Sequence, residues 1–432
     1  MSETRTFKPS GPLRGRVSVP SDKSITQRAL VIGAVSDGVA TIRDPLWAGD
    51  TEATAAMLGQ LGVRVEREGA DGRLVRLHGV GRRGLRPPAR PLDAHNSGTA
   101  MRLLAGLLAG QEGTFVIDGD ESLRSRPMDR VAVPLRAMGV RIEAREGRYA
   151  PLTIRGGEVD PIEYELPVAS AQVKSCVLLA GLHATGTTTV VEPVPSRDHT
   201  ERMLAGAGVP IERRGRRVWV TGPAQPHLDE VAIPGDVSSA AFLVAAATIV
   251  KGSDLRLTGV GLNPTRTGFF EVIRRMGGAL EWEVEADDGG EPRGAVHART
   301  AALQAATVAA DEVPLLVDEL PLVALLGAFA DGETRVAGAG ELRFKESDRL
   351  AATGTLLRNL GADIELTEDG FVVHGSGCVC GGIVRSLGDH RLALLGAVAG
   401  LASRAGVVVE GFDAAAVSFP SFEDVLREAL SS

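Results

Sequence analysis

One pattern of hydrophobic and polar positions occurs six times along the chain. Each copy begins at a polar or small residue, continues as an Ala- and Leu-rich stretch of helical length, and breaks before a β-branched segment. The copies begin near Asp22, Ser97, Ser170, Asp236, Asp318 and Asp389. The β-branched segments read VATIRD, TFVIDG, TTTVVE, DLRLTG, ETRVAG and VVVEG. A period of roughly 70–85 residues predicts a fold of repeated helix-and-strand modules.

A second pattern predicts another helix in each repeat. Five helical stretches end at a glycine that precedes a short strand, and glycine is the usual residue just after a helix because it accepts a left-handed backbone. These glycines are Gly62, Gly139, Gly208, Gly277 and Gly361. Residues typical of helix starts precede them, at Asp50-Thr51, Ser125, Ser196, Thr265 and Ser347. Each repeat is therefore predicted as strand, helix, strand, helix and strand, with room for one more strand.

The length of 432 residues is too great for one ordinary core and predicts two domains. Three repeats precede Gly235 and three follow, so we expect one domain over 21–235 and a second over 1–20 plus 236–432. The strand RGRVSVP is assigned to the second domain, which otherwise lacks an equivalent element. Two connections at one place make a hinge, and we expect closure on a substrate. Residues 287–293 are expected to form an exposed loop.

Composition excludes several classes of function. The net charge of −8 and the aromatic content of 4% argue against a nucleic-acid partner, which needs positive charge and stacking rings. The helical stretches are too short and too interrupted by glycine to cross a membrane. Three cysteines and no signal-peptide pattern favour a cytoplasmic protein. The isolated Cys378-x-Cys380 is poor support for zinc, and we expect no metal site.

Polar residues at the predicted helix starts are the candidate chemistry of the first half. Free N–H groups at a helix start attract anions, and nearby Lys or Arg strengthens that attraction. The candidates are Lys23, Ser24, Arg28, Gly98, Arg126, Ser170, Ala171, Gln172 and Arg197. Each one alone could equally be a helix cap or a surface residue.

The second half contributes both cations and carboxylates. Lys345 and Arg349 are four apart and would share a face if their segment is helical, while Arg391 stands at the sixth helix start. A solvated, salt-bridged helix is the alternative for that segment. If the helix starts converge, an acidic protein holds a basic cleft for small phosphates and carboxylates. Asp318 and Glu346 would be its acids, suited to one base and one acid in proton transfer.

The chain resembles the 5-enolpyruvylshikimate-3-phosphate synthases over nearly its whole length. The resemblance rests on PSDKSITQRAL, NSGTAMR, RSRPMDR, ASAQVKS, SRDHTERM, NPTRTG, VDELP, RFKESDRL, GDHRLA and SFPSF. It implies an α/β fold of two pseudo-symmetric domains, each an inside-out barrel of three βαβαββ repeats, with a cleft between them. It also implies transfer of the enolpyruvyl group of phosphoenolpyruvate to the 5-hydroxyl of shikimate 3-phosphate, by addition and then elimination of phosphate, in a monomer without cofactor or metal.

The resemblance also implies roles for individual residues. Shikimate 3-phosphate would be bound by Lys23, Ser24, Arg28, Ser170, Ala171, Gln172, Arg197, Asp318 and Lys345. Phosphoenolpyruvate would be bound by Lys23, Gly98, Arg126, Gln172, Arg349 and Arg391. Asp318 would accept the proton of the 5-hydroxyl, Glu346 would protonate the methylene carbon, and Lys23 would assist the chemistry.

Departures from the family and two rival functions also follow from the sequence. Many members have a Lys before the final FP motif, where this chain reads AAAVSFP. Gly98 is the form that leaves room for the inhibitor glyphosate, although ASAQVKS, SRDHTERM and VDELP resemble the inhibitor-tolerant branch. The UDP-N-acetylglucosamine enolpyruvyl transferases are the nearest rival, but they carry a Cys in the loop that reads DGDESLRSRP here. A non-catalytic anion-binding scaffold is the other.

Overall fold

The computed structural model describes residues 3–69 and 71–431, which form two compact units. The N-terminal unit comprises Ser21–Ile233 and Asp288–Glu291. The C-terminal unit comprises the described parts of Met1–Pro20, Pro234–Asp287 and Pro292–Ser432. Each unit has its own hydrophobic core, and each is described separately below.

The N-terminal unit contains three sheets of identical strand order. Its helices are α1 (Lys23–Ala34), α2 (Gly49–Gln60), α3 (Gly98–Ala109), α4 (Glu121–Ser125), α5 (Asp129–Ala137), α6 (Ala171–Gly181) and α7 (His199–Gly206). Its strands are β3 (Val39–Arg43), β4 (Arg64–Glu68), β5 (Leu74–His78), β6 (Leu92–Asp93), β7 (Gly113–Asp118), β8 (Arg141–Arg145), β9 (Tyr149–Gly156), β10 (Glu163–Glu165), β11 (Gly186–Val191), β12 (Ile211–Arg214), β13 (Arg217–Gly222) and β14 (Glu230–Ala232). The sheets run β14-β3-β5-β4, β6-β7-β9-β8 and β10-β11-β13-β12, and in each the first pair is parallel and the other two are antiparallel.

The C-terminal unit has a similar architecture, except that one of its three sheets has three strands instead of four among the described residues. Its helices are α8 (Val237–Ile249), α9 (Gly268–Arg275), α10 (Leu320–Phe329), α11 (Arg349–Asn359), α12 (His390–Ala402) and α13 (Phe422–Ser431), with 3-10 turns η1 (Val313–Leu315), η2 (Gly340–Phe344) and η3 (Phe412–Val417). Its strands are β1 (Thr4–Phe7), β2 (Arg14–Ser18), β15 (Asp254–Gly261), β16 (Ala279–Asp288), β17 (Glu291–Arg299), β18 (Thr307–Val308), β19 (Glu333–Val336), β20 (Asp363–Leu366), β21 (Phe371–His374), β22 (Gly382–Arg385) and β23 (Val407–Glu410). The sheets run β16-β17-β15-β2, β18-β19-β21-β20 and β1-β23-β22.

The first strands of the chain complete sheets of the C-terminal unit, as the sequence predicts for RGRVSVP. Strand β2 pairs in parallel with β15, with Val17 opposite Leu257. Strand β1 pairs antiparallel with β23, with Phe7 opposite Val407. All six predicted β-branched segments are strands: β3, β7, β11, β15, β19 and β23.

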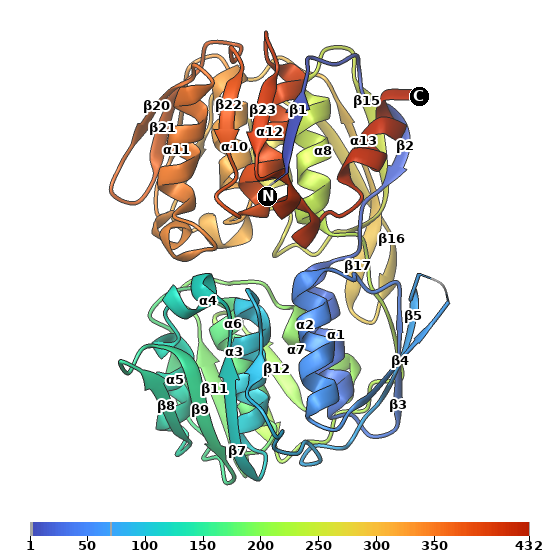
Figure 1. Cartoon of the computed structure of the whole chain (residues 1–432), viewed down its shortest axis with the longest axis vertical. Helices are drawn as coiled ribbons and strands as arrows, with labels where there is room; N and C mark the ends of the chain where they lie inside the picture. The colour runs from blue at the N-terminus through green and yellow to red at the C-terminus, as the bar shows by residue number, and fades with distance from the viewer. Residues whose placement is uncertain (1–2, 70, 432) are drawn as a thin grey trace. The chain divides into compact units, whose positions relative to one another are not determined.

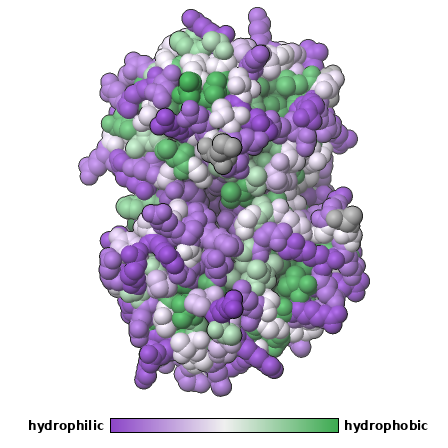
Figure 2. Space-filling view, in the orientation of Figure 1, coloured by the Kyte–Doolittle hydropathy of each residue, from purple (hydrophilic) through white to green (hydrophobic). Residues whose placement is uncertain are grey.

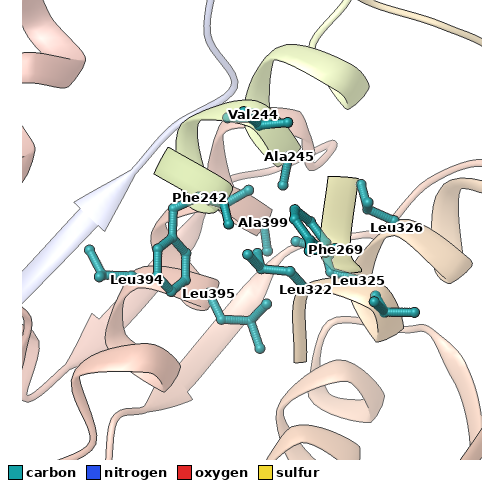
Figure 3. Close-up of a cluster of buried hydrophobic side chains, with 14 of the residues drawn as sticks. Phe242, Val244, Ala245, Phe269, Leu322, Leu325, Leu326, Leu394, Leu395 and Ala399 are labelled. Atoms are coloured by element: carbon teal, nitrogen blue, oxygen red, sulfur yellow. The ribbon is translucent and has the colours of Figure 1, made fainter. Parts of the chain in front are cut away.

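The Ala- and Leu-rich helices lie inside the units. Helices α8, α10 and α12 pack against one another, and α3 packs against both α1 and α6 (Figure 1). Figure 3 shows the interior of the C-terminal unit, where Phe242, Phe269, Leu322 and Leu395 come from four different helices. Polar residues predominate on the molecular face in Figure 2, and hydrophobic ones lie there in small separate patches. Helices buried on all sides are hydrophobic all round, which explains why these segments lack a polar stripe.

Small residues allow these helices to approach closely. A Cβ atom added at Gly106 of α3 would lie 2.1 Å from the carbonyl oxygen of Cys176 in α6. A Cβ at Gly181 of α6 would lie 2.7 Å from Val220 on the neighbouring sheet. The high glycine content therefore serves backbone contact as well as turns, because no side chain fits at such positions.

The predicted helix boundaries are accurate for the buried helices and less so for the second helix of each repeat. The predicted starts at Asp22, Ser97, Ser170, Asp236 and Asp389 are the N-caps of α1, α3, α6, α8 and α12. All five predicted terminal glycines have positive φ, from 74° to 96°. The second helices begin later or earlier than predicted, with N-caps at Ala48, Met128, Asp198, Thr267 and Asp348.

The expectation of an exposed loop over residues 287–293 is wrong. This segment forms the turn of the β16–β17 hairpin, where Gly289 and Gly290 have φ of 65° and 89°. Two successive residues with positive φ are typical of a tight hairpin turn. Glu291 is only 3% exposed. The sequence Asp-Asp-Gly-Gly was the available signal for this hairpin.

We expect the free energy of unfolding to depend on pH through His183, which lies just after α6. The residue is 3% exposed, and neither ring nitrogen has a hydrogen-bond partner among the described residues. Burial lowers the pKa of His183 to about 3, and Arg82 and Arg83 act in the same direction. Between about pH 6.5 and pH 3 the unfolded chain binds a proton that the folded chain does not, so stability falls as pH falls, by up to about 1.4 kcal/mol per pH unit.

We therefore expect His183→Gln to flatten the pH dependence of the free energy of unfolding over this window, as measured by urea denaturation at successive pH values. The matched control is His374→Gln, at a half-exposed position of β21, which shows whether the flattening is specific to the buried histidine. Identical slopes for wild type and His183→Gln would show that His183 does not titrate as described.

Candidate active site

The N-termini of the buried helices of the N-terminal unit lie next to one another. The side-chain amide of Gln27 in α1 donates to Ser97 Oγ, the N-cap of α3, at 2.8 Å. The amide of Gln172 in α6 donates to Thr99 Oγ1 in the first turn of α3, also at 2.8 Å. The starts of α1, α3 and α6 thus form one polar cluster, which we call the N-terminal cluster.

Lys23 and Ser24 occupy the first turn of α1. Asp22 caps the helix by accepting from the backbone N–H of Ile25 at 2.8 Å. Lys23 Nζ lies 3.0 Å from Asp50 Oδ2 at the start of α2, and both side chains are mostly but not wholly buried. Lys23 therefore keeps access to solvent while an acid fixes its position.

Arg28 is the most deeply buried predicted cation of this cluster, at 3% exposure. Its Nε donates to Thr200 Oγ1 at 2.8 Å, its Nη1 to the carbonyl of Ser24 at 3.0 Å and its Nη2 to Ser175 Oγ at 3.2 Å. Burial lowers the pKa of Arg28 to about 10, an effect that the charges of Glu201 and Asp22 oppose and that of Arg197 reinforces. The guanidinium stays charged at neutral pH, and all three bonds use neutral oxygen acceptors.

Gly98 and Arg126 meet at the start of α3. Arg126 donates to the carbonyl of Asn96 at 3.2 Å, to Asn96 Oδ1, and to Ser122 Oγ at 3.1 Å. A Cβ atom at Gly98 would lie 3.5 Å from Arg126 Nη1 and 3.0 Å from Arg102 Nη1. The absence of a side chain at Gly98 therefore leaves space beside two guanidinium groups.

Arg102 is a cation of this cluster that the sequence analysis did not assign. It donates to Gln172 Oε1 and, at 3.2 Å, to the carbonyl of Pro127. The sequence does contain an indication of this role, because Arg102 lies four residues after Gly98 in the NSGTAMR segment and residues four apart share a helix face.

Ser170, Ala171 and Gln172 stand at the start of α6, as predicted. Ser170 Oγ is the N-cap acceptor for the N–H of Val173, at 3.4 Å. Gln172 bridges α3 and α6 through Thr99 and Arg102. Arg197 lies partly exposed in the loop before α7, and its charge is close enough to act on Arg28. Two cations held near each other favour binding of an anion between them.

Three cations surround the carboxylate of Asp318 in the C-terminal unit. Lys345 Nζ lies 3.3 Å and Arg349 Nη1 3.0 Å from Asp318 Oδ1, while Arg391 Nη2 lies 3.6 Å from Oδ2. Asp318 lies two residues before α10, whose N-cap is Glu319, and Arg391 lies in the first turn of α12. Lys345 stands before α11 instead of within it, so the predicted shared helix face with Arg349 is wrong. The two side chains nevertheless reach the same oxygen.

Arg349 has the complementary environment of three carboxylates. Its Nε lies 2.7 Å from Asp389 Oδ2, its Nη1 contacts Asp318, and its Nη2 contacts Glu346. Burial alone would lower the pKa of Arg349, but the charges of Asp389, Glu346 and Asp318 raise it above its usual value. The side chain of Glu346 is 25% exposed, against 1% for Arg349 and 0% for Asp389. Glu346 is therefore the most exposed of the three acids on this arginine, and Asp318, at 10%, is the next.

We call the connected side chains of Asp318, Lys345, Glu346, Arg349, Asp389 and Arg391 the C-terminal cluster. A buried chain of polar contacts extends this cluster to α8. Arg391 Nη1 lies 3.4 Å from Glu319 Oε1, which also accepts from Ser238 Oγ. Ser238 in turn accepts from Arg266 Nη2 at 2.8 Å, and the same nitrogen lies 3.3 Å from Asp236 Oδ1. Glu319 and Arg266 were not assigned from the sequence, although VDELP and NPTRTG contain them. The starts of α8, α10 and α12 are thereby connected.

The two clusters have the chemistry of sites for small anions. Each combines helix N-termini with Lys or Arg side chains, and the C-terminal cluster adds carboxylates that can exchange protons. In the part of the chain that the structure describes, no group of three or more His, Cys, Asp or Glu side chains is arranged to hold a metal ion. Over the same residues, no helix is both long and apolar enough to cross a membrane.

Comparisons with known proteins match the chain along almost its whole length. The family model described as EPSP synthase (3-phosphoshikimate 1-carboxyvinyltransferase) matches residues 7–426. A 3-phosphoshikimate 1-carboxyvinyltransferase of Thermus thermophilus is 50% identical over 429 residues, covering 98% of both chains, and one of Acidithiobacillus ferrooxidans is 48% identical over 422 residues, covering 98% of this chain and 96% of the relative.

A solved structure extends the match to the backbone. The structure of EPSP synthase from Acinetobacter baumannii superposes with a TM-score of 0.87 at 39% identity, and the match covers 99% of this chain and 98% of that one. Its fold therefore agrees with the mixed α/β architecture of six small sheets described above. With the matched family model and relatives of this similarity, the chain belongs to the EPSP synthase family.

Proposed function

We propose that the N-terminal and C-terminal clusters act together to perform the EPSP synthase reaction of the shikimate pathway. The reaction transfers the enolpyruvyl group of phosphoenolpyruvate to the 5-hydroxyl of shikimate 3-phosphate and releases inorganic phosphate. The observation that carries the proposal is the arrangement of Asp318 and Glu346 on Arg349, beside Lys345 and Arg391. Both substrates are small anions, so cations at helix N-termini suit them.

The acceptor substrate, shikimate 3-phosphate, is assigned mainly to the starts of α1 and α6. Arg28 and Arg197 supply the charge for its phosphate, with Lys23 and the hydroxyls of Ser24 and Ser170 around them. Ala171 and Gln172 offer the first turn of α6, and Lys345 and Asp318 bind the ring hydroxyls. A guanidinium pair is well suited to a phosphate because it presents several N–H donors in fixed geometry.

Phosphoenolpyruvate is assigned to the space beside Gly98. Arg126 and Gln172 border that space in the N-terminal unit, and Lys23 contributes a point charge. Arg349 and Arg391 bind the same substrate from the C-terminal unit. The charges of both arginines are compensated by acids, and the substrate carboxylate and phosphate compete with these acidic partners.

Asp318 and Glu346 carry out the two proton transfers. Asp318 accepts the proton of the 5-hydroxyl as the hydroxyl oxygen attacks C2 of phosphoenolpyruvate. Glu346 protonates the methylene carbon, and the product of this addition is a tetrahedral ketal. The Glu346 carboxylate then removes a proton from the new methyl group as the C2–O bond to phosphate breaks, and Asp318 returns its proton to the departing phosphate, which leaves the enolpyruvyl ether. Lys23 and the arginines stabilise the charge of the leaving phosphate.

The reaction requires both clusters at one cleft, and we propose that residues 21–235 and 1–20 plus 236–432 are domains that close on the substrates. We further propose that the enzyme works as a monomer. The rival UDP-N-acetylglucosamine transfer is disfavoured because the loop before Arg126-Pro127 has no Cys. The rival of a silent anion-binding scaffold predicts no phosphate release.

Replacing either proposed proton carrier should abolish most of the turnover. We expect Asp318→Asn and Glu346→Gln each to lower kcat by about 10²-fold or more, because each removes one proton transfer. The measurement is phosphate release with both substrates, compared with each substrate alone. Glu346→Gln should keep the fold, because Arg349 retains Asp389 and Asp318.

Glu333→Gln, which alters an exposed partner of Arg335, is the matched control and should retain full activity. Full turnover in both site variants would remove the proton-transfer assignment. Release of phosphate by neither wild type nor variants would overturn the proposed function itself.

A methyl group at position 98 should weaken the binding of phosphoenolpyruvate and of glyphosate. Because the added Cβ of Gly98→Ala lies 3.0 Å from Arg102 and 3.5 Å from Arg126, we expect a several-fold higher KM for phosphoenolpyruvate and weaker glyphosate inhibition. The KM for shikimate 3-phosphate should change much less. Inhibition assays at low phosphoenolpyruvate give both values.

Gly59→Ala is the control, since its Cβ would meet nothing within 4 Å in the exposed end of α2. Wild-type activity that is unaffected by glyphosate would contradict the expected sensitivity. An unchanged KM for phosphoenolpyruvate in Gly98→Ala would contradict the location of that substrate.

A further inference from the structure

Four charged side chains form a closed, largely buried ring beneath the N-terminal cluster. Lys174 Nζ lies 3.1 Å from Glu192 Oε1 and 2.7 Å from Glu201 Oε1. Arg213 spans the same two acids, with contacts of 3.0 Å to Glu192 and 3.4 Å to Glu201. The side chains of Lys174 and Glu192 are fully buried, that of Glu201 is 9% exposed and that of Arg213 is 26% exposed. None of these residues was assigned a role from the sequence.

This ring holds the loop that carries Arg197. Ser196 lies between β11 and α7, and its backbone N–H donates to Glu192 Oε1 at 3.0 Å, as does its hydroxyl. Lys174 Nζ donates to the carbonyl of Ser196 at 3.3 Å. The backbone N–H, the hydroxyl and the carbonyl of Ser196, the residue before Arg197, are therefore all hydrogen-bonded to the ring. The loop has no helix or strand of its own to fix its course.

The ring also acts on Arg28. Glu201 lies in α7 beside Thr200, whose hydroxyl accepts from Arg28 Nε at 2.8 Å. Among the charges around Arg28, that of Glu201 has the largest effect in favour of the protonated guanidinium. Lys174 thus contacts both Glu201, whose charge acts on Arg28, and Ser196, which precedes Arg197. It lies in the same helix as Ser170 and Gln172, which border the proposed acceptor site.

A role in stability alone does not account for this arrangement. Taking ions out of water costs several kcal/mol each, so an apolar replacement of a buried ion pair is often as stable. The charged ring fixes the orientation of a loop of polar residues, which apolar packing would not do. Binding sites gain affinity when the supporting groups hold the ligand-contacting residues in place before binding.

We propose that Lys174 is a positioning residue that sets the affinity for the phosphate of the acceptor substrate by fixing Arg197 and Arg28. The inference rests on the proposed function, since it names how one substrate is held. Lys174 does not contact the substrate, and the second substrate, placed beside Gly98, depends on other supports. The expected signature is therefore a selective loss of affinity for shikimate 3-phosphate.

The test is steady-state kinetics of Lys174→Met, with calorimetric titration of shikimate 3-phosphate alone. We expect the KM for shikimate 3-phosphate and its Kd to rise about tenfold or more, since small displacements of binding groups are costly. The KM for phosphoenolpyruvate should stay within about twofold of the wild-type value, because its proposed contacts do not touch the ring. Equal rises in both KM values, or no rise in either, would overturn the proposal.

Two further variants separate position from charge and from folding. Arg213→Met removes the other cation of the ring, which contacts Glu192 and Glu201 instead of Ser196. This variant should change the KM for shikimate 3-phosphate far less than Lys174→Met does. Lys174→Met/Glu192→Gln keeps the ring neutral and should restore the melting temperature while the acceptor KM stays raised. Recovery of both properties in this double variant would show that Lys174 only compensates charge.

Failure of this inference is distinguishable from failure of the proposed function. If wild-type protein releases phosphate only with both substrates but Lys174→Met keeps its acceptor KM, the positioning role is wrong and the function stands. If wild-type protein shows no such dependence on both substrates, the proposed function falls first.

Discussion

The N-termini of buried helices converge within each unit, and this convergence determines where the polar and charged residues lie. Helices formed from Ala, Leu, Val and Gly can be buried on all sides, but their first N–H groups still need hydrogen-bond acceptors. Asp22, Ser97, Ser170, Asp236 and Asp389 provide those acceptors as N-caps. Because the helices of each unit pack together, their capped ends gather in one place, and so do the charged residues that follow the caps.

The two clusters compensate their charge differently, which gives them different chemistry. Arg28 forms its hydrogen bonds with hydroxyl and carbonyl oxygens, so its positive charge remains available to an anion. Arg349 instead contacts Asp318, Glu346 and Asp389, and a ligand there must compete with acids. The first arrangement suits binding, whereas the second also supplies groups that can exchange protons. The proposed reaction uses both kinds of arrangement.

Much of the fold was predictable because its signals are local. The caps at Asp22 and Ser97, the glycines after the helices and the β-branched strands each follow from a few neighbouring residues. The start of α5 was missed because Arg126-Pro127 suggested a helix beginning there, whereas the short helix α4 ends at Ser125. The β16–β17 hairpin was missed because its charged sequence resembles a loop, although Glu291 is buried beside His199, 2.6 Å from its Nδ1.

The candidate site was predictable to the extent that its residues stand at helix starts or in recognisable segments. The supporting residues were not. Arg102 and Lys174 lie within helices α3 and α6, Glu319 is the N-cap of α10, and Arg266 lies in the turn before α9. At each of these places a single charge gives no indication of its partner. Their contacts join residues 18 to 81 positions apart, as in Lys174 with Glu192 and Glu319 with Ser238. Such pairs are fixed by tertiary packing, which the sequence does not reveal one residue at a time.

We propose that one molecule of shikimate 3-phosphate binds to both clusters. A crystal structure of the complex with shikimate 3-phosphate would locate the ligand. We expect one ligand in simultaneous contact with Arg28 and Arg197 of the N-terminal unit and with Asp318 and Lys345 of the C-terminal unit. A ligand bound by residues of only one unit, with the other cluster facing solvent, would rule out this proposal.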